Sequence, residues 1–201
     1  MQQRMIWIAG LAALAGCHGN DRADSERTAL ALVAASRSPA GIGPELVDTD
    51  LAEQARRLQL VRRATLDTLK REKLLAVLAG AGGPDQQYPP SEWPQKQRER
   101  ATRGLAATAQ GECKATFAPQ LAADRVKALT EPMQGVPPEV RAAQQELQSE
   151  LRDAEAVRLD CQPGHVGVLL VKSAFGGRRA IDLWEFGATS FEVNPNDPAM
   201  K

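Results

Sequence analysis

The chain has 201 residues, of which 25 are basic and 25 are acidic, and only 4% are aromatic. Because there is neither a basic excess nor a block of like charge, the composition argues against nucleic-acid binding and against a charged tail. Few aromatic residues, together with abundant Ala, Leu, Gln, Glu and Arg, favour helices over an all-β fold.

The first 17 residues have the layout of a secretory signal. Arg4 precedes an apolar run over residues 5–15, and small residues follow just before Cys17. A helix that spans a membrane needs about 20 apolar residues, and this run is shorter. The sequence therefore predicts a cleaved signal over residues 1–16. One alternative is an ordinary secretory signal, cut after Gly16, in which Cys17 has no special role.

The segment from Leu14 to Cys17 closely resembles the lipobox of bacterial lipoproteins. This resemblance implies that Cys17 becomes the first residue of the mature chain and carries diacylglycerol and an acyl chain such as palmitate. Two or more acyl chains hold a protein stably on a membrane. Residue 18 is His, whereas Asp at this position resembles an inner-membrane retention signal, so the resemblance implies an outer-membrane location facing the periplasm.

Helices dominate the expected elements after the leader. Residues 17–23 are polar and predict a short tether, and a loop rich in Pro and aromatic residues is expected over 85–94. Apolar periodicity, Pro residues at helix starts and Gly or Pro residues at helix ends predict the helices. Their expected ranges are 24–35, 50–79, 95–109, 119–129 and 138–159. Arg62 and Lys73 interrupt the apolar stripe of the second helix.

The pattern changes near the C-terminus. Residues 165–171 and 178–186 are rich in Val, Leu, Ile, Trp and Phe and flank a Gly-containing loop, which predicts a β-hairpin. Since an isolated hairpin is marginal in water, this one is expected to pack on helices or to pair with a further strand. Residues 187–201 predict a flexible tail. The fold class is therefore α+β, mainly α: a single domain over 24–186, with a helical bundle and a C-terminal β-hairpin.

Two cysteines remain after Cys17, and they predict one disulfide between Cys113 and Cys161. Paired cysteines in an oxidising periplasm usually form such a bond, which the chain-entropy model values at about 4 kcal/mol for this loop. A redox or metal pair is the alternative, but CxxC spacing is absent and His165 is the nearest His. The helical prediction places Cys161 at the end of helix 138–159 and Cys113 between the two preceding helices.

The sequence predicts no catalytic, cofactor-binding or metal-binding residues. His165 is interpreted as the start of a strand, and Asp182, which lies between two apolar strand residues, is the least routine acid. The sequence has no HExxH, GxSxG or SxxK motif. The hairpin tip, with Phe175, Arg178 and Arg179, is the expected partner contact, since aromatic and Arg side chains suit interfaces. The alternative is a solvated turn.

The chain is therefore expected to be a non-catalytic lipoprotein of the bacterial envelope that binds another envelope protein and no nucleic acid. One role is an inhibitor or immunity protein against a periplasmic cell-wall hydrolase. The alternative role is an assembly or pilot lipoprotein of an outer-membrane complex. An envelope hydrolase, with a site built from dispersed acids, is a third hypothesis.

Overall fold

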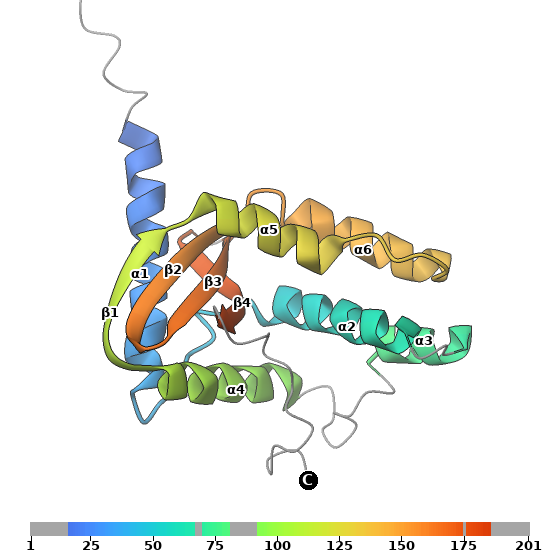
Figure 1. Ribbon diagram of the computed structural model, residues 1–201, viewed down its shortest axis with the longest axis horizontal. Helices are drawn as coiled ribbons and strands as arrows, with labels where there is room; N and C mark the ends of the chain where they lie inside the picture. Colours follow the sequence, from blue (N-terminus) through green and yellow to red (C-terminus); the bar gives the residue numbers. More distant parts are fainter. Residues whose placement is uncertain (1–15, 67–69, 81–91, 175, 186–201) are drawn as a thin grey trace, which may run out of the picture.

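The computed structural model describes residues 16–66, 70–80, 92–174 and 176–185 (Figure 1). Within these ranges the chain is α+β and mainly helical, as the sequence predicts. The elements in chain order are α1 (Gly16–Ser36), α2 (Thr49–Leu66), α3 (Arg71–Leu78), α4 (Trp93–Thr108), β1 (Ala109–Phe117), α5 (Pro119–Thr130), α6 (Pro138–Glu150), β2 (Glu155–Pro163), β3 (His165–Lys172) and β4 (Arg178–Glu185). No helix in the described ranges is both long and apolar enough to cross a membrane.

The strands form one antiparallel sheet in the order β1-β2-β3-β4. The prediction of two paired C-terminal strands is thus extended, because β3 also pairs with β2. The predicted helix over 138–159 is wrong beyond α6, whose last residue is Glu150. The segment after it switches to a period of two, with Val157 and Leu159 buried and Arg158 exposed between them. A buried strand, and not a helix turn, satisfies that pattern.

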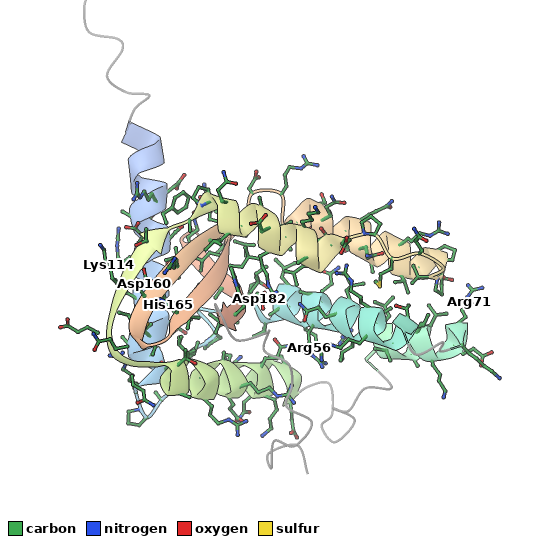
Figure 2. All side chains as sticks on the ribbon, viewed as in Figure 1. Arg56, Arg71, Lys114, Asp160, His165 and Asp182 are labelled. Carbon is green, nitrogen blue, oxygen red and sulfur yellow. A yellow bond between two sulfur atoms is a disulfide. The ribbon has the colours of Figure 1, made fainter. Side chains whose placement is uncertain are left out.

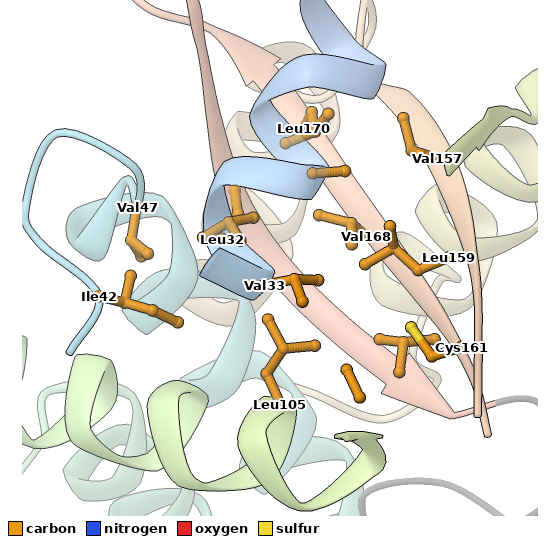
Figure 3. Packing of buried hydrophobic residues seen from close by; sticks show 14 residues of the cluster. Leu32, Val33, Ile42, Val47, Leu105, Val157, Leu159, Cys161, Val168 and Leu170 are labelled. Atoms are coloured by element: carbon orange, nitrogen blue, oxygen red, sulfur yellow. The ribbon is translucent and has the colours of Figure 1, made fainter. Parts of the chain in front are cut away.

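Alternation along the strands divides the core into two parts, one on each face of the sheet. On the first face, Leu159 and Val168 pack against Leu32 of α1 and Leu105 of α4 (Figure 3). On the second face, Leu169 belongs to a separate cluster supplied by α2, α3, α5 and α6. The helices therefore pack on both faces of a sheet, which is a more layered arrangement than the helical bundle expected from the sequence.

The predicted long helix over 50–79 is divided into two helices. Lys70, just before α3, has an extended backbone (φ −62°, ψ 149°), so α3 begins anew. Arg62, which interrupts the apolar stripe of α2, donates hydrogen bonds to the carbonyl oxygens of Ala128 (2.5 Å) and Glu131 (2.6 Å). These acceptors lie at the C-terminus of α5, where a cation satisfies carbonyls that have no helical partner. The charged residue therefore joins α2 to α5.

Helix α1 includes the residues that were expected to form a tether, since it begins at Gly16. It also protects the free edge of β1. Arg37 donates a 2.6 Å hydrogen bond to the Ala109 carbonyl oxygen, and Glu26 accepts one of 2.9 Å from the Phe117 amide. Side chains of α1 and of Arg37, the residue after it, therefore satisfy backbone groups that would otherwise be available to another strand.

Candidate binding surface on the sheet

The predicted disulfide between Cys113 and Cys161 is present in the structure. The two residues are direct partners in the pairing of β1 with β2, and their Cα atoms lie 4.1 Å apart. The predicted setting of Cys161 at a helix end was wrong, because Cys161 lies on β2, whereas Cys113 lies between α4 and α5 as expected, on β1. The bond cross-links neighbouring strands on the face that packs against α1 and α4.

A row of polar side chains crosses the opposite face of the sheet. Lys114 of β1 is paired with Asp160 of β2, and Asp160 is paired with His165 of β3. The neighbours of these residues in the sequence, Cys113, Cys161 and Val166, face α1 and α4. Because side chains alternate along a strand, Lys114, Asp160 and His165 point to the other face of the sheet. Figure 2 labels all three close together on the sheet. Arg158, two residues before Asp160, shares this face.

Asp160 organises the row through hydrogen bonds to a single carboxylate oxygen. Its Oδ1 atom accepts a hydrogen bond from Arg158 Nε and lies within hydrogen-bond distance of His165 Nδ1, each at 2.7 Å. Partial burial acts to raise the pKa of Asp160, but Arg158 and His165 outweigh it, and the pKa lies below its ordinary value of 3.8. The carboxylate is therefore charged near neutral pH and orients both neighbours.

These side chains remain accessible to a partner. Arg158, Asp160 and His165 have side-chain exposures of 45%, 36% and 48%. Lys114 is exposed and has no ion-pair partner among the residues that the structure describes. We call Lys114, Arg158, Asp160 and His165 the sheet-face cluster.

A second, less exposed group adjoins the sheet-face cluster and connects the sheet to α5. Arg125 of α5 donates a hydrogen bond of 2.5 Å to Asp182 of β4 and lies 5.3 Å from the ring centroid of Trp184. Burial raises the pKa of Asp182 above its ordinary value, although Arg125 acts in the opposite direction. Trp184 lies across Gly167, where a Cβ atom would be 2.2 Å from the indole ring. Asp182 is therefore already paired with Arg125 inside the protein.

The expected contact at the hairpin tip is only partly described. Phe175 lies outside the described residues, and Arg179 is partly exposed. The prediction is wrong for Arg178 as an exposed contact, because its side chain is 6% exposed and pairs with Glu155 at 2.6 Å. Arg178 is the first residue of β4, and its guanidinium group lies between Asp21 of α1 and Glu155 of β2. The Cys17 side chain also lies outside the described residues.

The structure brings His165 together with Asp160 and not with Asp182. Within the described ranges, no three His, Cys, Asp or Glu side chains gather in a way that could hold a metal ion. A cavity of about 470 Å³ lies elsewhere, between α5 and α6, and its lining includes Ala122, Val126 and Leu151. The sheet-face cluster is thus an open, hydrogen-bonded surface that presents cationic donors around one carboxylate.

Sequence reasoning missed Lys114, Arg158 and Asp160 because it did not predict β1 or β2. The alternation of charged and apolar residues in Arg158, Leu159, Asp160 and Cys161 was the available signal for a strand with one solvated face.

Comparison of the chain with protein families, with curated proteins and with solved structures finds no match to any of them.

Proposed function

We propose that this protein is a lipid-anchored envelope protein that binds another protein and performs no catalysis. The lipobox-like segment ending at Cys17 supports attachment to the outer membrane on its periplasmic side. The disulfide between Cys113 and Cys161 is in keeping with an oxidising compartment. Binding is supported by the exposed sheet-face cluster, in which Asp160 holds Arg158 and His165 by hydrogen bonds on paired strands.

The proposed partner is a cell-wall hydrolase, which this protein inhibits. Glycoside hydrolases use a pair of carboxylic acid residues that flank the bond to be cleaved. Arg158 and Lys114 offer cationic donors to such carboxylates, and Arg binds carboxylates with two parallel hydrogen bonds. Because Asp160 already orients Arg158, little order has to be gained by the Arg158 side chain when the complex forms. The observation that carries this proposal is the exposed, preorganised Arg158–Asp160–His165 arrangement.

A panel of purified lysozymes and related hydrolases, assayed with the purified lipoprotein, tests the inhibitor role. We expect at least one enzyme to be slowed, and we expect Arg158→Glu and Lys114→Glu to weaken inhibition by tenfold or more, roughly the value of a close charge pair. The matched control is Arg71→Glu, a charge reversal at an exposed residue of α3 that pairs with Glu139. Inhibition of none of the enzymes would refute the inhibitor role. Inhibition that survives the cluster variants would refute the assigned surface.

Attachment of lipid to Cys17 requires a separate test. We expect the protein produced in a Gram-negative host to fractionate with membranes and its N-terminal peptide to carry the mass of diacylglycerol and an acyl chain. Cys17→Ser should release the domain to the periplasm. If the Cys17→Ser protein stays on the membrane, the lipoprotein assignment is wrong.

A further inference from the structure

The lipid site and the folded domain are separated by very few residues. Cys17 is the second residue of α1, and Asp21 is only four residues later. Asp21 Oδ1 lies 3.8 Å from Arg178 at the start of β4. Ser25, which is fully buried, donates a hydrogen bond to Glu155 at the start of β2. The body of the domain thus holds the chain from the first turns of α1 onward.

This short connection limits the distance between the domain and a membrane. A fully extended chain covers at most about 3.6 Å per residue, so Asp21 can lie no more than about 14 Å from Cys17. In a continuous helix the same four residues span about 6 Å. The lipid headgroup layer is itself about 6 Å thick on each side of the bilayer. Whether residues 17–21 are extended or helical, the nearest end of the domain can therefore touch the lipid headgroups.

We infer that the end of the sheet formed by Lys172 and Arg178 rests on lipid headgroups and that the sheet-face cluster points away from the membrane. This inference rests on the proposed function, because it requires lipid on Cys17. Lys172 is the exposed last residue of β3 and the pairing partner of Arg178, whose guanidinium group lies beside Asp21. Lys172 therefore lies at the end of the sheet that is nearest to the proposed lipid on Cys17.

The opposite end of the sheet carries the sheet-face cluster. Strand β3 runs from His165 to Lys172, and a rise of about 3.4 Å per residue separates the two by about 24 Å. Figure 1 shows the start of α1 extending beyond the sheet at one end. The strand register places Lys114 and Asp160 in one row with His165, the first residue of β3. The protein that binds the cluster would therefore approach from the side of the periplasm.

The two lysines at opposite ends of the sheet provide an internal comparison. Lys172 and Lys114 are both exposed on strands, so a water-soluble acylating reagent can reach both in the free domain. The full-length lipoprotein, reconstituted into phosphatidylethanolamine–phosphatidylglycerol vesicles, is compared with the Cys17→Ser protein mixed with the same vesicles. We expect anchoring to slow acylation of Lys172 about threefold or more and that of Lys114 less than about twofold, as measured by mass spectrometry.

A variant with a 20-residue Gly/Ser linker between Asn20 and Asp21 tests whether the short connection to Cys17 is what slows the acylation of Lys172. Such a linker has a root-mean-square length of about 25 Å, so Lys172 should recover the acylation rate of the Cys17→Ser protein. If the lipoprotein does not float with vesicles, the proposed anchor fails, and this inference fails with it. If it floats and the two lysines react equally, the anchor stands and the orientation is wrong. Protection of Lys172 that persists with the linker would also overturn the inference.

Discussion

Arg178 of β4 and Glu155 of β2 form an ion pair of 2.6 Å, with strand β3 between the two strands that supply them. Their side chains are 6% and 20% exposed, and Ser25 of α1 donates a further hydrogen bond to Glu155. One carboxylate therefore joins two strands to α1. Asp21 of α1, 3.8 Å from Arg178, and Ser25 of α1, bonded to Glu155, connect the helix to this pair.

Replacing Arg178 by Met should lower the free energy of unfolding by about 2–4 kcal/mol. The substitution leaves the Glu155 carboxylate largely buried without its cation, and removal of one member of a buried pair is strongly destabilising. Urea denaturation followed by circular dichroism measures the change. The matched control is Arg179→Met at the next, more exposed position, where about 0.5 kcal/mol is expected. Equal losses in the two variants would contradict the role assigned to Arg178.

Loss of the disulfide should lower the free energy of unfolding by up to about 4 kcal/mol, because the bond closes a loop of 48 residues in the unfolded chain. The double substitution Cys113→Ala/Cys161→Ala avoids leaving a single free thiol. Its urea midpoint should agree with that of the wild-type domain in the presence of a dithiol reductant. A midpoint within error of the oxidised wild type would show that the bond contributes nothing to stability.

Gly167→Ala should destabilise the domain by about 1–3 kcal/mol, the usual cost of overpacking. Its Cβ atom would lie 2.2 Å from Cε2 of Trp184, so the indole ring must move and weaken its contact with Arg125. The free energy of unfolding is measured for Gly167→Ala, Trp184→Leu and the double variant. We expect Gly167→Ala to cost much less when residue 184 is Leu. An additive double variant would show that the ring is not the obstacle.

Stability should fall less steeply with rising pH in Asp182→Asn than in the wild type. Burial raises the pKa of Asp182 above 3.8, so between pH 3.8 and that raised value the folded state holds a proton that the unfolded state has lost. In that window the wild type loses stability as pH rises, and Asn removes this contribution. Unfolding free energies measured from pH 4 to pH 7 give the two slopes.

Glu139→Gln is the control for this pH series, because the pKa of Glu139 is shifted in the opposite direction by hydrogen bonds to its own backbone and to Arg71. Its contribution is complete above pH 4.5 and is lost as pH falls through the lowered pKa. Glu139→Gln should therefore have the wild-type slope between pH 5 and pH 7. Parallel curves for the wild type and Asp182→Asn would contradict the direction of the shift at Asp182.

Local signals in the sequence predicted the starts of several helices well. Pro119 and Pro138 are the first residues of α5 and α6, as expected from the preference of Pro for the first helical position. Residues 151–159 were assigned to the wrong element because their apolar residues also fit a helical period. Only pairing with β1 and β3 makes the strand favourable there, and those partners are distant in the sequence.

The sequence by itself determined the mainly helical α+β class, the pairing of Cys113 with Cys161 and the presence of the last two strands. These features depend on local periodicity and on a short list of cysteines. Tertiary structure alone decided that Arg178 is buried and that Lys114, Arg158, Asp160 and His165 share one surface. The physical reason is that strand register sets which distant residues become neighbours, and register depends on packing across the whole sheet.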